Sequence, residues 1–208
     1  MKKILNEFIG SFFWTLSMVM CLLGNADQYT GLAVGAMLMV LVFAGGHLSG
    51  AHYNPVVTVA VWLRGKCSVS DVPIYIFAQL IGAAIAAIVV DSVLLQKLGE
   101  LNFPKSGLFP TFGSEFLGSF VIVYVLLNVA TAKDTAGNSF YGLAVGGCLM
   151  ACIYSFGNLS GGAFSPAVSL GMAISKIIPF SSIWIYWIAE LMGGILAAFT
   201  FLFVNGKD

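Results

Sequence analysis

The chain has 208 residues, a net charge of zero, 59% hydrophobic residues and only 9% charged residues. Because soluble domains carry about 25% charged residues, this composition cannot cover a water-facing surface and predicts an integral membrane protein. The balanced charge offers no basic face for nucleic acid, and little sequence is left for a soluble domain. We therefore expect a single transmembrane domain over residues 1–208.

Runs without Asp, Glu, Lys or Arg predict six transmembrane helices, since about 20 apolar residues cross a bilayer. Residues 8–26, 72–90 and 116–132 are each long enough for one helix, and residues 177–206 are interrupted only by Glu190. Two other runs are too long for one helix and are expected to hold a helix plus an excess segment. These are residues 28–63 and 135–175.

Both excess segments contain glycines followed by a proline, at residues 45–55 and 156–166. This pattern breaks a helix and allows a short one to restart with proline at its first position. Irregular backbone is tolerated at membrane depth only inside protein or along a water-filled cavity. Paired broken segments in two halves of a chain therefore indicate a permeation or binding site.

The two halves of the sequence match at four landmarks. The Glu-Phe-x-Gly sequence at residues 7–10 returns at residues 115–118, an offset of 108 positions. Sequences beginning at Gly31, Asn54 and Gln79 match those beginning at Gly142, Ser165 and Glu190, each at an offset of 111. A nearly constant offset indicates a duplication, with repeats at approximately residues 4–95 and 112–204. Each half holds three helices, so the second repeat is expected to be inverted relative to the first.

The distribution of basic residues predicts the orientation. One set of connecting segments carries Lys2, Lys3, Arg64, Lys66, Lys133 and Lys207, and the other carries Lys97, Lys105 and Lys176. By the positive-inside rule, we expect both termini in the cytoplasm. We also expect the plasma (inner) membrane as the location. The prediction is an all-α membrane protein with six transmembrane helices and two re-entrant half-helices in an inverted repeat.

The two proline motifs resemble those of the aquaporin and glycerol-facilitator family, the major intrinsic proteins. The first motif is Asn54-Pro55-Val56, with valine in the usual alanine position, and the second is Ser165-Pro166-Ala167, with serine for the usual asparagine. The resemblance covers roughly residues 4–204. It implies an aquaporin-like homotetramer in membrane lipid, with a pore in each protomer for water or small uncharged solutes. It implies neither a cofactor nor enzymatic activity.

The motif residues define two half-helix N-termini that face one another across the pore. Each N-terminus presents unpaired N–H groups and about half a positive charge, which opposes a cation but not a neutral molecule. Asn54 and Ser165 occupy the N-cap positions, where both residue types are favourable. Serine offers one hydroxyl where asparagine offers an amide, so the two donors at the centre of the pore are unequal.

The glycine-rich segments before the caps are expected to expose carbonyl groups to the pore. The candidate acceptors are the backbone carbonyls of Gly50, Ala51, His52, Gly161, Gly162 and Ala163. The His52 side chain either lines the pore or acts as a hydrogen-bond staple. Neither His47 nor His52 has further ligands with the spacing of a metal site.

Matching to the family places the outer selectivity filter at Val34, Ile153, Gly162 and Val168. None is aromatic or charged, and valine replaces the arginine of water-selective members, so we expect an apolar, wider filter. A hydrophobic ring can also block conduction by dewetting. By the family's spacing, the apolar wall continues through Trp14, Leu38, Ile122 and Leu149, although each position equally suits ordinary packing.

Carboxylates within the spans are either proton relays or scaffold groups that accept hydrogen bonds from the re-entrant backbone. The resemblance favours the scaffold role for Glu7 and Glu115, and Gln79 and Glu190 occupy matching positions in the two repeats.

Two alternatives to a passive channel remain. Inverted repeats with broken helices also build secondary transporters, but the broken segments contain no Asp or Glu for an ion site. A sealed, non-conducting membrane scaffold is compatible with the altered filter. An enzyme is not indicated, because no nucleophile–base pair or metal cluster is visible.

Overall fold

The computed structural model describes all residues except 25, 95–102, 104–105 and 207–208. Lys97, Lys105, Lys207 and the C-terminal boundary of the first predicted repeat lie outside the described residues. In the described part of the chain, six helices are long and apolar enough to cross a membrane. They are α1 (Lys2–Leu23), α2 (Thr30–Ser49), α4 (Asp71–Val89), α5 (Leu108–Thr131), α6 (Tyr141–Ser160) and α8 (Ile183–Asn205).

Two short helices complete the predicted pattern: α3 (Pro55–Leu63) and α7 (Pro166–Ile174). A π-helical segment, Val90–Leu94, extends α4, and single 3-10 turns lie at Asp27–Tyr29, Lys133–Thr135 and Phe180–Ser182. No strand is present among the described residues. The structure confirms the predicted class, an all-α membrane protein of six spans and two half-helices.

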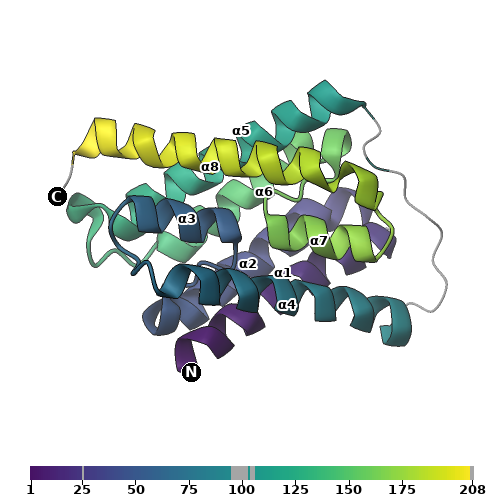
Figure 1. Ribbon diagram of the computed structural model, residues 1–208, viewed down its shortest axis with the longest axis horizontal. Helices are drawn as coiled ribbons and strands as arrows, with labels where there is room; N and C mark the ends of the chain where they lie inside the picture. The colour runs from purple at the N-terminus through teal and green to yellow at the C-terminus, as the bar shows by residue number, and fades with distance from the viewer. Residues whose placement is uncertain (25, 95–102, 104–105, 207–208) are drawn as a thin grey trace.

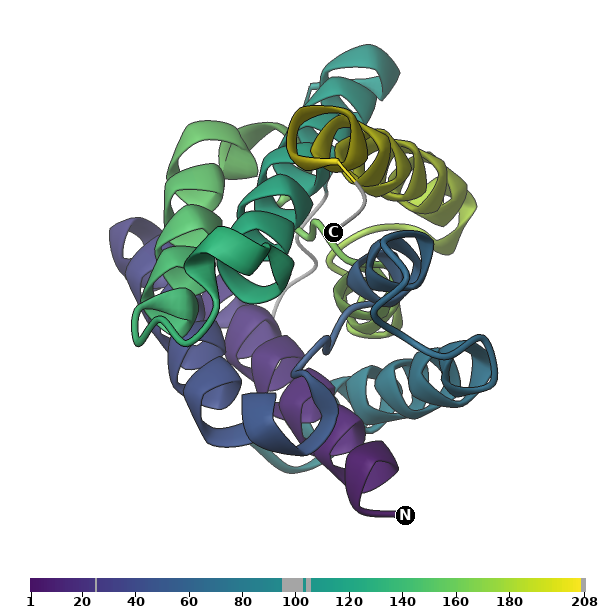
Figure 2. The same cartoon turned by 90° about the vertical axis from the view of Figure 1, so that its left-hand side faces the viewer.

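The two half-helices lie end to end inside the bundle of long helices (Figure 1). In the end-on view of Figure 2, α3 lies in front of α7, and both lie between α8 and α4. The beginning of α1 and the end of α8 lie at the same end of the molecule in Figure 1, as an even number of spans requires. The half-helices therefore fill the space between the spans of the two halves.

Glycines allow the long helices to approach closely. A side chain at Gly82 of α4 would collide with the Phe8 carbonyl of α1, and one at Gly193 of α8 would collide with the Phe116 carbonyl of α5. Small residues at such crossings are the usual means by which helices associate in lipid, where no hydrophobic driving force acts between them. The matched pairs α1–α4 and α5–α8 thus pack in the same way.

Each half-helix packs against long helices of the opposite half. Helix α3 lies against α8 and α5, and α7 lies against α4 and α1, while each half-helix also contacts the last span of its own half. Gly194 of α8 leaves no room for a side chain beside Val56 of α3, and Gly171 of α7 likewise fits against Thr15 of α1. Because each half-helix packs against spans of the opposite half, the two halves share one packed core.

Candidate functional site

The two half-helices begin where the two re-entrant loops meet. Asn54 is an extended N-cap residue of α3, and its Oδ1 accepts a hydrogen bond from Val56 N at 2.9 Å. Its Nδ2 donates to the carbonyl oxygen of Phe164, also at 2.9 Å, in the loop before α7. The Asn54 side chain therefore caps its own half-helix and ties it to the other loop.

Ser165 occupies the matching N-cap position of α7 but makes no side-chain cap hydrogen bond. Its hydroxyl is buried and has no partner among the described residues. Although serine is a favourable cap residue in general, its shorter side chain does not reproduce here the two bonds of Asn54. The structure thus places the expected unequal pair of donors at the point where the half-helices meet.

Both re-entrant loops use left-handed backbone conformations. Helices α2 and α6 end at Gly50 and Gly161, with φ of 88° and 92°. Tyr53 and Phe164 have φ of 52° and 49°, which is unfavourable for residues with a side chain. Their rings lie against Gly10 and Gly118, where a side chain would collide with them. Such strained backbone persists only where surrounding contacts hold it.

Glu7 supplies those contacts in the first half. Its Oε1 accepts hydrogen bonds from His52 N at 3.0 Å and Ser49 Oγ at 2.5 Å. Its Oε2 accepts from Tyr53 N and from Gln79 Nε2, each at 2.7 Å. A carboxylate that accepts four hydrogen bonds compensates for its burial and fixes the loop backbone.

Glu115 occupies the same place in the second half. It accepts hydrogen bonds from Ser160 Oγ at 2.5 Å, Ala163 N at 3.1 Å and Phe164 N at 2.6 Å. Glu190 accepts one from Ser165 N at 3.1 Å. All three glutamates are fully buried, so the geometry is that of groups that hold the loops.

The loop supports include residues that the sequence analysis did not single out. Tyr75 OH donates to the Ser49 carbonyl oxygen at 3.0 Å, and Tyr186 OH donates to the Ser160 carbonyl oxygen at 2.6 Å. Both tyrosines and both serines stand 111 positions apart. The same repeat offset that revealed the duplication could have identified them.

The carbonyl segments differ in exposure. Gly50 is exposed, whereas Ala51, His52, Gly161, Gly162 and Ala163 are buried. His52 Nδ1 lies 3.2 Å from Thr58 Oγ1, and its ring packs edge-on against Tyr75. Of the two roles considered for His52, this geometry is that of the hydrogen-bond staple.

The four candidate filter positions are closely packed rather than open. Val34 and Val168 are 0% exposed and Ile153 is 7% exposed. Gly162 is buried, and a Cβ atom there would lie 3.5 Å from Ile153. The candidate wall residues Trp14, Leu38, Ile122 and Leu149 are also buried. The four filter positions are apolar, as expected, and all four are buried from water in this structure.

Phe103 lies beside the second re-entrant segment. Its backbone N–H donates to the Ile177 carbonyl oxygen at 3.0 Å, and its ring would lie 3.6 Å from a Cβ atom at Gly161. Because it belongs to the connection between the halves, no repeat partner marks it in the sequence. Phe103 brings to this end of the interior an aromatic ring that the four filter positions lack.

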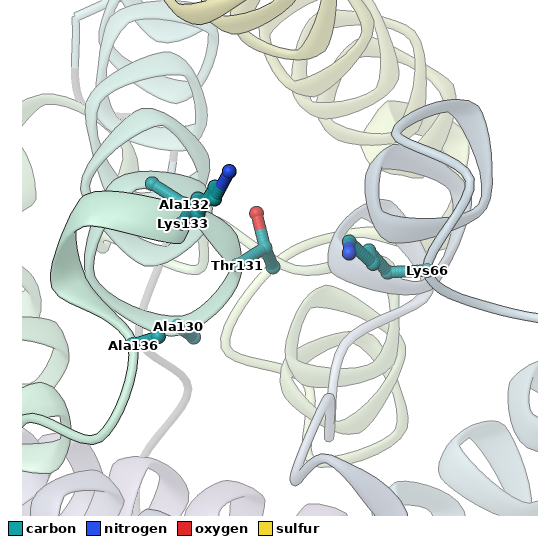
Figure 3. Close-up of a pocket in the computed structure, with 6 residues that line it drawn as sticks. All are labelled: Lys66, Ala130, Thr131, Ala132, Lys133 and Ala136. Atoms are coloured by element: carbon teal, nitrogen blue, oxygen red, sulfur yellow. The ribbon is translucent and has the colours of Figure 1, made fainter. Parts of the chain in front are cut away.

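A cavity of about 420 Å³ opens near the ends of α3 and α5. Figure 3 shows Lys66 and Lys133 on opposite sides of Thr131 in its lining. Ala130, Ala132 and Ala136 complete the lining. Nearby, the Arg64 guanidinium donates to the Thr131 carbonyl oxygen at 3.4 Å and lies 4.9 Å above the Phe201 ring. We call this cavity, which has Lys66 and Lys133 in its lining, the basic vestibule.

Six spans around two opposed half-helices define an integral membrane protein of the class that moves solutes across a membrane. The chain belongs to the major intrinsic protein family, whose model matches residues 1–201. It is therefore an integral membrane protein that acts as a passive channel for water and small solutes.

The chain is similar over most of its length to two curated sequences and to one solved structure. The chain is 36% identical to glycerol uptake facilitator protein-like 6 of Lactiplantibacillus plantarum, with 100% of both chains covered. It is 30% identical to nodulin-26 of Glycine max, covering 100% of this chain and 79% of that protein. The X-ray structure of the aquaglyceroporin from Plasmodium falciparum matches with a TM-score of 0.78 at 22% identity, covering 96% of this chain and 94% of that chain.

Proposed function

We propose that this channel conducts water and uncharged solutes up to about the size of glycerol through a pore in each protomer. The observation that carries the proposal is the meeting of the two half-helix N-termini, joined by the hydrogen bond from Asn54 to the Phe164 carbonyl. The positive ends of the two helix dipoles oppose cations and leave neutral solutes unaffected. The name of the Lactiplantibacillus plantarum relative supports a solute such as glycerol.

The apolar ring supports permeation of solutes larger than water. An arginine would present five fixed donors and a full charge, whereas Val168 and Val34 present only methyl groups. A solute that enters must displace these side chains, because both valines are fully buried. Side-chain rotation in a ring of small apolar residues is a smaller change than the removal of a bound guanidinium.

We assign the individual roles accordingly. Asn54-Pro55-Val56 and Ser165-Pro166-Ala167 form the pore motif, while Val34, Ile153, Gly162 and Val168 form the filter. Glu7, Glu115, Gln79 and Glu190 act as the scaffold of the loops. We further assign a homotetramer in the plasma or inner membrane with both termini in the cytoplasm, and repeats at approximately residues 4–95 and 112–204.

Stopped-flow light scattering of reconstituted vesicles tests the proposal with water, glycerol and urea. We expect each flux to exceed that of protein-free vesicles, to rise linearly with the solute gradient and to be independent of ion gradients. A flux that requires an ion gradient would instead establish a secondary transporter. If neither water nor any solute crosses faster than through protein-free lipid, the filter is closed and the protein is a sealed, non-conducting scaffold.

A further inference from the structure

The two halves differ at the residue that supports each scaffold glutamate. In the first half, Gln79 Nε2 donates to Glu7 Oε2 at 2.7 Å and to Thr58 Oγ1 at 3.0 Å. An amide carries these two hydrogens at every pH at which the protein folds. In the second half, Glu190 occupies the matching position, 111 residues later, and a carboxylate carries no hydrogen.

The carboxyl groups of Glu115 and Glu190 accept hydrogen bonds from consecutive backbone N–H groups, those of Phe164 and Ser165, so the two carboxyl groups lie side by side. Both side chains are 0% exposed, so no bulk water separates them. Two ionised carboxylates in such a contact repel one another and cannot form a hydrogen bond, because neither has a donor. One proton placed between them removes the repulsion and supplies the missing donor.

The neighbouring donors indicate which carboxyl group carries that proton. Glu115 accepts hydrogen bonds from Ser160 Oγ, Ala163 N and Phe164 N, as a carboxylate does. Glu190 Oε1 accepts from Ser165 N, but Glu190 Oε2 is buried and accepts no hydrogen bond among the described residues. The Ser169 hydroxyl instead donates to the carbonyl oxygens of Ser165 and Pro166. A buried oxygen without a donor is satisfied when it carries a hydrogen itself.

We propose that Glu190 is a protonated carboxylic acid at neutral pH and that its O–H donates to the Glu115 carboxylate. Glu190 is then a positioning residue that acts through Glu115. Its O–H donates to the loop-holding glutamate of the second half, as the Gln79 amide donates to Glu7 in the first half.

The surroundings contain nothing that would stabilise a second negative charge. Glu115 on α5 is the charged group beside Glu190, since it binds the backbone N–H groups of Ala163 and Phe164 next to Ser165. Ser169 of α7 is neutral, and the Tyr186 hydroxyl on α8 is occupied by the Ser160 carbonyl. Cys152 of α6 is the other titratable group near the pair, and it too is neutral when protonated. The nearest elements therefore offer no cation.

The proposal predicts that alkaline pH acts on one half of the channel only. Loss of the Glu190 proton would place two adjacent anions beneath Ser165 and the strained Phe164, and the second loop would lose its anchor. The Glu7–Gln79 pair cannot respond in this way because the amide does not titrate. Channel permeability should accordingly fall reversibly at high pH.

Infrared spectroscopy of the full-length channel in lipid tests the protonation state without measuring flux, so its failure is distinct from a failure of the proposed function. We expect a protonated carboxylic-acid carbonyl band at neutral pH that is absent from Glu190→Gln. Gln79→Glu should add a second such band, because it creates the same acid pair in the first half. Absence of the band from the wild-type protein, or its persistence in Glu190→Gln, overturns the proposal.

The pH profile of water flux is the second readout. For each assembled variant, the ratio of flux at alkaline pH to flux at neutral pH is compared. We expect this ratio to fall in the wild-type channel and to stay near one in Glu190→Gln, where an amide donates at all pH values. An equal alkaline loss in both proteins overturns the proposal, since a purely structural role for Glu190 would not separate them. If Glu190→Gln does not assemble, titration of the wild-type carbonyl band still decides whether an acid is present.

Discussion

Gly35 and Gly146 lie against one another where α2 crosses α6. A Cβ atom added to Gly35 would lie 2.7 Å from the Gly146 carbonyl oxygen, and one added to Gly146 would lie 2.5 Å from the Gly35 carbonyl oxygen. The two residues also stand 111 positions apart in the sequence. The halves of the molecule therefore meet at equivalent points of equivalent helices.

Replacing either glycine by alanine should separate α2 from α6 and destabilise the folded channel. Overpacking of this kind typically costs about 1–3 kcal/mol. The measurement is the midpoint of thermal unfolding in detergent for Gly35→Ala and Gly146→Ala. Gly147→Ala is the matched control, because a Cβ atom there meets nothing within 4 Å. Equal effects at positions 146 and 147 would show that helix propensity, not the crossing, governs stability.

Asn54→Ser gives the first half-helix the cap residue of the second. It removes the donor to the Phe164 carbonyl, which is then buried without that hydrogen bond, at a cost of about 1–3 kcal/mol. We expect a lower unfolding midpoint and little change in the order of solute permeabilities. The reverse exchange, Ser165→Asn, should not destabilise the channel, since the Ser165 hydroxyl has no partner to lose among the described residues. Greater loss in Ser165→Asn than in Asn54→Ser would contradict this.

Substitutions at the two valines of the candidate filter, Val34 and Val168, which we call the valine ring, should change the size of the solutes that the channel conducts. Val34→Ala and Val168→Ala remove methyl groups from fully buried positions and should raise glycerol flux more than water flux, at a cost of about 1–3 kcal/mol in stability. Val168→Arg adds bulk and charge and should lower the ratio of solute flux to water flux. Both ratios are measured by stopped-flow light scattering on equal amounts of assembled protein.

Val40→Ala on α2 is the control for this series, because Val40 is 55% exposed on the outer surface of the molecule. It should leave the flux ratio as it is in the wild-type channel. The assignment of the ring fails if the ratio is the same in Val168→Ala, Val168→Arg and Val40→Ala.

The basic vestibule should contribute to cation exclusion, because the valine ring carries no charge. Exposed charges act over about 10 Å at 0.1 M salt, so the effect should weaken as salt is raised. We expect the double substitution Lys66→Gln and Lys133→Gln to increase potassium leak through vesicles several-fold at low salt while glycerol flux is maintained. Lys176→Gln, outside the cavity lining, is the control. If potassium leak is the same in the double variant and in Lys176→Gln, the basic vestibule does not contribute to cation exclusion.

Much of the fold could be predicted because its determinants are periodic and local. Charge-free runs marked the spans, and the prolines at positions 55 and 166 marked the first residue of each half-helix. The repeat offset placed Glu7 and Glu115 in equivalent environments, and the structure gives both of them loop N–H donors.

Other features depend on three-dimensional packing between segments that no repeat or periodicity in the sequence relates to one another. The sequence shows that the ring is apolar, but its closure depends on how Val34, Ile153 and Val168 fit together in three dimensions. Phe103 has no counterpart in the other half, so the duplication could not reveal its contact with the second loop. The missing cap bond of Ser165 is likewise a matter of side-chain reach, since the residue type alone favours capping.

The exchange of half-helices between the two halves bears on how the protein is made. Residues are synthesised and inserted from the N-terminus, yet α3 rests on α8, which is the last span to emerge. The first re-entrant segment must therefore wait, without its final neighbours, until the ribosome has nearly finished the chain. The contacts between α3 and α8 are far apart in sequence, and such contacts form slowly. A truncated product that lacks α8 cannot cover the face of α3 that packs against it. Such a product would be a ready target for membrane quality control.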